Sequence, residues 1–185
     1  EAGMTYDAMS LVKNGTDRYG NKLPVYLINF GGGQSALYAY LTAILLKIFT
    51  VSFVVIRLPQ VILSIIALLL LYKLLKENSG YKLALVIAFI YVISPVNIMR
   101  SRWGLDAYLL MSMLVISLYS LVHSINVKKN YMFVISGILF GITLYTYILS
   151  YIIILVLLVV LSIYYLYLKE INFKQLIIFG VPLFI

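Results

Sequence analysis

The sequence predicts an all-α protein, built as a polytopic transmembrane helical bundle with an external loop that carries short juxtamembrane helices. Hydrophobic residues make up 64% of the 185 residues and the mean hydropathy is +1.06, well above the composition of soluble domains. The apolar runs after Gln34 are continuous and long enough for helices. A membrane β-barrel would instead show short segments of alternating polarity, so the runs favour helical spans.

Charge and cysteine content narrow the classes of function. The formal net charge is +8, but the lysines lie between apolar runs, where positive residues set the orientation of a membrane protein. We therefore expect membrane lipids as partners and no nucleic acid. The chain has no cysteine, which excludes disulfides, thiolate zinc sites and thiol nucleophiles within it.

The first part of the chain, residues 1–34, is a polar head that holds three of the six acidic residues. Apolar residues on one face predict a short amphipathic helix at its start. Gly15 is a good stop for this helix, because glycine readily adopts the left-handed conformation after a last turn. Tyr26 to Phe30 are expected to be extended, and Gly31 to Gly33 to form a flexible hinge.

The run from Tyr38 to Val51 is expected to lie at the membrane surface rather than to cross it, because Lys47 interrupts it and the next span starts by Leu58. Residues 1–57 then form the first external loop, with amphipathic and interfacial helices. Residues 58–185 form a bundle of about five to six spans, truncated at both ends. The predicted spans are Leu58–Leu75, Leu83–Ser94, Tyr108–Val122, Tyr131–Tyr145 and Ile148–Leu168.

The lysine-bearing connections predict which chain segments share a side of the membrane. Residues 73–82, 128–129 and 169–174 alternate with the other connections, so all three lie on one side, which the positive-inside rule makes the cytoplasm. The head, Arg57, the polar island from Arg100 to Asp106 and the turn from Tyr145 to Tyr151 then share the external face. Charges far apart in the sequence are thereby expected to converge.

Arg100 and Arg102 depart from the positive-inside pattern, because they lie in an external connection. The planar guanidinium matches phosphate oxygens, so a lipid-linked phosphate is one interpretation. Snorkelling to lipid headgroups or pairing with Asp106 is the alternative. Asp106 itself is interpreted as a partner of Arg102, as a charge at a helix start, or as a metal or hydroxyl ligand.

Glu1 and Asp7 are the acidic candidates in the first helix. They are six residues apart, or about 120° on an ideal helix, and so do not share a face. A carboxylate held in a water-poor site can deprotonate an acceptor hydroxyl, whereas acids on a solvated helix usually serve solubility. Tyr145 and Tyr147 allow sugar stacking, although an interfacial tyrosine belt is favoured.

Several strings, in this order, resemble the GT-C superfamily of membrane glycosyltransferases, in the group of protein O-mannosyltransferases, aminoarabinose transferases and dolichyl-phosphate-mannose-type transferases. They are Glu1-Ala2 with YDAMSLVKNGTDRYGNKLP, then ALYAYLTAILLKIF, Ile56-Arg57-Leu58-Pro59, SPVNIMRSRWGLDA and ISGILFGITLYTY. They cover most of residues 1–151. Relatives carry a basic residue, a lysine, and two prolines before Leu-Tyr, whereas this chain has GGGQSALY. The role of that lysine in the relatives therefore cannot be assigned to Gln34 or Ser35.

The resemblance implies an inverting sugar transfer from a polyprenyl-phosphate-linked donor to an acceptor hydroxyl at the external face. Glu1 resembles the second member of an Asp-Glu pair whose Asp would precede this chain. Asp106 matches an acidic position near the donor or a metal, and Arg100 and Arg102 match basic positions. The resemblance leaves open whether a divalent metal takes part.

The resulting hypothesis is a multi-pass glycosyltransferase of the bacterial cell membrane, acting on a lipid, glycan or protein acceptor. Glu1 or Asp7 activates the acceptor hydroxyl, while Arg57, Arg100 and Arg102 hold the donor phosphate. Asp106 is the ligand if a metal is used. The alternative is a transporter or flippase for lipid-linked saccharides, which would tend to place ionisable groups at mid-membrane.

Overall fold

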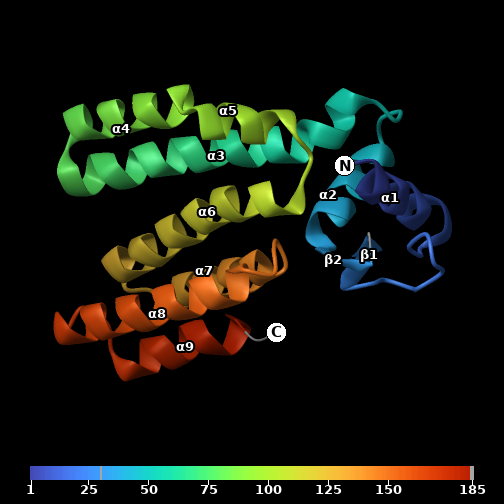
Figure 1. Ribbon diagram of the computed structural model, residues 1–185. Helices are drawn as coiled ribbons and strands as arrows, with labels where there is room; N and C mark the ends of the chain where they lie inside the picture. The colour runs from blue at the N-terminus through green and yellow to red at the C-terminus, as the bar shows by residue number, and fades with distance from the viewer. Residues whose placement is uncertain (30, 184–185) are drawn as a thin grey trace.

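The computed structural model describes residues 1–29 and 31–183, which form a polar head and a helical bundle joined at one end (Figure 1). The prediction of an all-α bundle is confirmed, with one small sheet in addition. The head comprises α1 (Ala2–Asn14), β1 (Tyr26–Asn29), β2 (Gly32–Ser35) and α2 (Leu37–Leu46). The bundle comprises α3 (Phe53–Ser79), α4 (Tyr81–Ile93), α5 (Pro95–Arg102), α6 (Asp106–Val127), α7 (Asn130–Leu144), α8 (Ser150–Tyr167) and α9 (Phe173–Leu183).

The first helix of the head forms as its sequence predicts. Gly15 follows α1 with φ 69°, and its backbone N–H donates to the carbonyl of Leu11 at 3.1 Å. The apolar face of α1 packs on α2 through fully buried Met4 and Ala8. Because buried Leu109 of α6 belongs to the same core, the head is fixed to the bundle by apolar packing.

The segment after α1 differs from the expected hinge. Tyr26–Asn29 is extended as predicted, and Phe30 lies outside the described residues. The prediction of a flexible glycine hinge is wrong, because Gly32 and Gly33 belong to β2, which pairs antiparallel with β1. A side chain at position 33 would overlap the Tyr26 ring, so glycine here permits an aromatic ring to lie across the hairpin.

Three of the described helices, α3, α6 and α8, are long and apolar enough to cross a membrane. The pair α4 and α5 counts as a fourth span if it is taken as one helix bent by 55°. The predicted span Leu83–Ser94 ends before Pro95, as α4 stops at Ile93, and Pro95 then begins α5, where its missing N–H costs little. Part of the expected polar island is therefore helical. The ten residues of α2 extend only about 15 Å, too short to cross about 30 Å of hydrocarbon.

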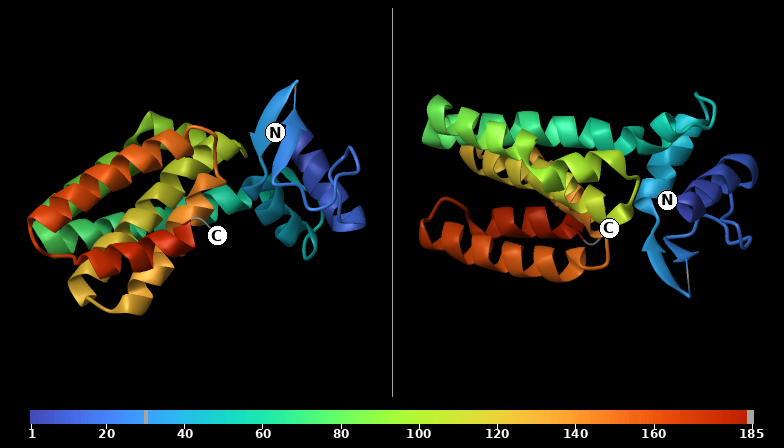
Figure 2. Two further views of the ribbon diagram at one scale, coloured as in Figure 1. Left: turned by 90° about the horizontal axis from the view of Figure 1, so that it is seen from below. Right: turned by 45° about the horizontal axis from the view of Figure 1, so that its top comes forward.

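The expected alternation of the connections is visible in the arrangement of the helices. The connections α3–α4, α6–α7 and α8–α9, which have lysines in them or in the adjoining helix ends, lie at one end of the bundle, and the head lies beyond the other end (Figures 1 and 2). The α5–α6 and α7–α8 connections also lie at the head end. Arg57, Arg100 and Asp106 are thus at the same end as Glu1, as the sequence predicts.

Candidate active site

An ion pair joins the head to the bundle. Arg57, in the second turn of α3, donates from Nε to Oε1 of Glu1 at 2.8 Å and from Nη2 to Oε2 at 3.1 Å. This two-pronged geometry is the strong form of an arginine–carboxylate contact. Sequence reasoning placed both residues on one face but assigned them separate roles, whereas the structure pairs them.

The connection between α5 and α6 reaches the same carboxylate. The backbone N–H of Gly104 donates to Oε1 of Glu1 at 3.0 Å. A Cβ at position 104 would lie 3.1 Å from the Tyr38 hydroxyl and 3.2 Å from Oε1 of Glu1, which is tighter than most real Cβ contacts. Glycine therefore allows the close approach. Buried Tyr38 donates its hydroxyl to the carbonyl of Ile56 at 3.1 Å, which fixes α2 against the start of α3.

These contacts set the protonation of Glu1. The Arg57 hydrogen bonds are the main cause that lowers the pKa of Glu1; burial opposes them and the Gly104 N–H assists them. Glu1 is therefore ionised at neutral pH and is a weak proton acceptor while paired. Glu1 occupies Nε and one N–H of Nη2, and the Arg57 side chain is 36% exposed, so further guanidinium N–H groups can bind another anion.

Asp106, the first residue of α6, joins the hairpin to the bundle. Its Oδ2 accepts the backbone N–H of Ser35 at 3.2 Å and its Oδ1 accepts that of Ala107 at 2.9 Å. The helix-start interpretation matches this geometry. Both oxygens face N–H donors, and over residues 1–29 and 31–183 no group of three or more acidic, histidine or cysteine side chains gathers. The residues present do not fit a metal, and no step is assigned to one.

Arg100 and Arg102 lie on α5, immediately before the connection that contacts Glu1. Arg102 is exposed, and neither arginine forms an ion pair with Asp106 within the described part of the chain. The Nε of Arg100 is buried and has no hydrogen-bond acceptor among the described residues. A buried donor of this kind costs free energy as long as no acceptor reaches it.

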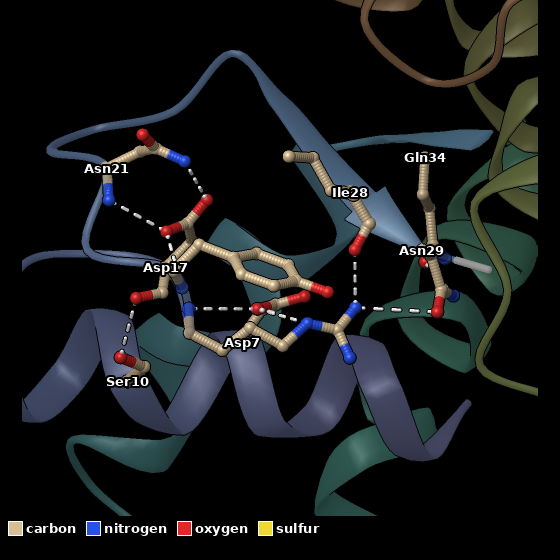
Figure 3. A network of polar contacts seen from close by, with 9 residues as sticks. Asp7, Ser10, Asp17, Asn21, Ile28, Asn29 and Gln34 are labelled. Carbon is tan, nitrogen blue, oxygen red and sulfur yellow. Dashed lines mark hydrogen bonds and ion pairs between the residues drawn. The ribbon is translucent and has the colours of Figure 1, made fainter. Parts of the chain in front are cut away.

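Asp7 is not brought into this cluster. It is 1% exposed and lies inside the head, where its Oδ1 accepts the backbone N–H of Arg18 at 3.1 Å and lies 3.3 Å from the Arg18 Nε (Figure 3). Arg18 also donates to the carbonyl of Ile28 at 2.6 Å. The pair therefore holds α1, the loop after it and β1 together, a role that does not require contact with a substrate.

Asp17 organises the loop after α1 (Figure 3). Its Oδ1 accepts the backbone N–H groups of Tyr19 and Asn21 at 2.9 and 2.8 Å, and its Oδ2 accepts the Asn21 side chain at 2.9 Å. Burial acts to raise the pKa of Asp17, but these hydrogen bonds outweigh it and lower the pKa. The ionised carboxylate is thus the form that stabilises the loop.

We expect Asp17→Ala to loosen this loop. Protection of the Tyr19 and Asn21 amides from hydrogen exchange should fall about tenfold to a hundredfold, corresponding to about 1–3 kcal/mol. Because the folded pKa is below the unfolded value of about 4, the stabilisation is complete above pH 4 and is lost as pH falls through the folded pKa. The difference in amide protection between wild type and Asp17→Ala should therefore disappear as the pH falls below the folded pKa of Asp17. Lys22→Ala, an exposed change in the same loop, is the control.

The fold and the site define an integral membrane protein with a charge-paired polar site at one end of an apolar helical bundle. Residues 34–185 match the family described as dolichyl-phosphate-mannose-protein mannosyltransferase, and the chain belongs to this family of membrane glycosyltransferases. The match confirms the resemblance noted in the sequence. It includes Arg57, Arg100, Arg102 and Asp106, whereas Glu1 and Asp7 precede it. No curated protein and no solved structure matches the chain.

Proposed function

We propose that the protein transfers a sugar from a polyprenyl-phosphate-linked donor to an acceptor hydroxyl at the external face of the membrane. The observation that carries this proposal is the junction of Glu1, Arg57 and the Gly104 backbone. The head supplies the carboxylate, α3 supplies the guanidinium, and the α5–α6 connection supplies a backbone N–H. All three lie at the end of the bundle that also holds Arg100 and Arg102. Family membership supplies the reaction class.

The proposed reaction is a direct displacement. The acceptor oxygen bonds to the anomeric carbon, the bond from that carbon to the donor phosphate breaks, and the phosphate leaves with the electron pair. The configuration at the carbon inverts. Arg57, Arg100 and Arg102 stabilise the negative charge that develops on the phosphate, a form of electrostatic catalysis.

The hydroxyl proton passes to Glu1. In the ion pair, Arg57 lowers the pKa of Glu1. Glu1 therefore becomes a stronger base when the guanidinium turns toward the departing phosphate. The ion pair thereby couples phosphate departure to proton acceptance. Asp7 is enclosed with Arg18, and the proposal gives it no part in the proton transfer.

The external location is supported by the distribution of positive charge. Lysines of the α3–α4, α6–α7 and α8–α9 connections lie at the end opposite the head, the end that the positive-inside rule assigns to the cytoplasm. The head end carries the four arginines, two of them ion-paired, and also Lys13, Lys22 and Lys47, so the assignment of sides rests on the short connections of the bundle. The length of α2, too short to cross, keeps the head on the same side as the start of α3.

A transfer assay tests the function. The full-length protein, purified into nanodiscs, is given a radiolabelled polyprenyl-phosphate sugar with lipid, glycan and protein acceptors. We expect label to move to one acceptor class at a rate proportional to enzyme. The same protein in liposomes is assayed for movement of the labelled donor between leaflets. Donor movement without transfer would contradict the proposal and favour a flippase.

A further inference from the structure

A separate cavity lies between the hairpin of the head and the α7–α8 turn. Its volume is about 200 Å³, and the head contributes Val25, Tyr26 and Ser35 to its walls. The bundle contributes the rest, which are Leu144, Tyr145, Ile148 and Tyr151. Two parts of the chain more than a hundred residues apart thus form one concave surface that holds three tyrosines.

The Tyr26 ring is held in place by the hairpin. It lies across Gly33, where a Cβ would overlap the phenol. Tyr26 pairs with Ser35 in the sheet, so the ring and Ser35 belong to the same small, hydrogen-bonded unit. Tyr26 is nevertheless 53% exposed, which leaves much of the ring available to a ligand.

The cavity borders the candidate active site through two short links. Ser35, which lines the cavity, donates its backbone N–H to Asp106 at 3.2 Å. Asp106 follows Gly104 by two residues, and Gly104 binds Glu1 at 3.0 Å. A ligand in the cavity would therefore lie at the same end of the bundle as the groups assigned to sugar transfer, linked to them through Asp106 and Gly104.

The lining selects a chemical class of ligand. Among the residues that the structure describes, no charged side chain lines the cavity, so it does not suit a phosphate, which requires cationic groups or N–H donors. Tyrosines offer both an apolar face and a hydroxyl, which matches a pyranose ring with its C–H face and hydroxyl rim. The volume is below the roughly 300–1,000 Å³ of sites for drug-sized ligands, in keeping with a single sugar ring.

We propose that this tyrosine cavity, formed by Tyr26, Tyr145, Tyr151 and Ser35, is a binding site for a neutral pyranose ring. The inference rests on the proposed function for the expectation that the protein handles sugars. The ring belongs either to the acceptor or to the sugar of the donor. Sugar binding is thus assigned to tyrosines at a helix turn, where the sequence alone favours an interfacial tyrosine belt.

Ligand-observed NMR on the full-length protein in nanodiscs tests the site without any need for catalysis. The probes are the methyl α-pyranosides of mannose, glucose and galactose. We expect at least one to bind the wild type, and Tyr26→Ala and Tyr145→Ala each to weaken it by about tenfold. Tyr167→Ala, at the opposite end of the bundle and 84% exposed, should leave binding unchanged. Absence of binding to the wild type, or unchanged binding in both cavity variants, would overturn the proposal.

Two adjacent glycines provide a matched pair that leaves every cavity side chain in place. Gly33→Ala places a methyl group where the Tyr26 ring lies, so the ring must move. Within residues 1–29 and 31–183, a Cβ on Gly32 meets only the Asn29 carbonyl, at 3.8 Å. We expect Gly33→Ala to weaken glycoside binding as Tyr26→Ala does, and Gly32→Ala to retain it. Equal binding by the two alanine variants would contradict a site built on the Tyr26 ring.

Transfer kinetics separate the two sources of the sugar. Higher KM for the acceptor in Tyr145→Ala would assign the cavity to the acceptor, and higher KM for the polyprenyl donor would assign it to the donor. A wild type that binds glycosides but transfers no sugar contradicts the proposed function and leaves the cavity proposal supported. A wild type that transfers sugar but binds no glycoside overturns the cavity proposal alone.

Discussion

Replacement of Arg57 by alanine is expected to lower the rate of sugar transfer by about a hundredfold to a thousandfold, the usual loss for one preorganised donor to a developing charge. The variant loses a donor to the departing phosphate and leaves the Glu1 carboxylate without its partner. Arg57→Lys should recover part of the rate, because an ammonium restores the charge but not the two-pronged geometry of the 2.8 and 3.1 Å contacts. The measurement is the initial rate of label transfer by purified protein.

Lys13→Ala is the matched control for this variant. It removes a positive charge from the exposed end of α1, away from the ion pair, and should keep the wild-type rate. Thermal unfolding in detergent verifies that each variant is folded. Wild-type transfer by a folded Arg57→Ala protein would contradict the role given to the guanidinium.

Replacement of Gly137 by alanine is expected to destabilise the bundle by about 1–3 kcal/mol, the usual cost of overpacking. In α7, a Cβ on Gly137 would overlap the carbonyl oxygen of Phe179 and lie 2.7 Å from Cγ of Pro182. The obstruction includes backbone of α9, so a whole helix must shift. Such a shift also disturbs the edge-to-face contact of Phe140 with Phe179, whose ring centroids are 5.7 Å apart.

The matched control for this contact is Gly180→Ala, in α9 itself. Outside its own helix backbone, no heavy atom of the described residues lies within 4 Å of a Cβ at Gly180, and alanine is the better helix former by about 1 kcal/mol. We therefore expect Gly180→Ala to unfold at the wild-type temperature or slightly above it, and Gly137→Ala to unfold several degrees lower in detergent. Equal unfolding temperatures for the two variants would show that α7 and α9 do not approach as closely as described.

The helices could be predicted from the sequence because their signals are local. Apolar runs located α3, α4, α6, α7 and α8, and Gly15 marked the end of α1. The alternation of lysine-bearing connections also placed Glu1, Arg57 and Asp106 at one end of the bundle, because it depends only on the parity of the helices. The spacing of Gly137 and Gly141 is a small-residue motif typical of close helix packing, and it could have indicated the α7–α9 contact.

The contacts that shape the site could not be predicted in this way. The Glu1–Arg57 pair spans 56 positions and the Glu1–Gly104 contact spans 103, and no local pattern specifies such partners. The hairpin was missed because glycines disfavour strands; here Gly33 is required by the ring of Tyr26 from the facing strand. The burial of Asp7 was missed because its partner, Arg18, lies beyond the turn that follows α1.

The claim that the head and the bundle form one site is tested most directly by a double-mutant cycle on the rate of sugar transfer, with Glu1→Gln, Arg57→Ala and the double variant. Because the two side chains are bonded to each other and are proposed to be coupled during the reaction, we predict that the double variant loses less rate than the product of the two single losses. If the two losses instead multiply, as for independent residues, the ion pair is not a functional unit and this account of the site is contradicted.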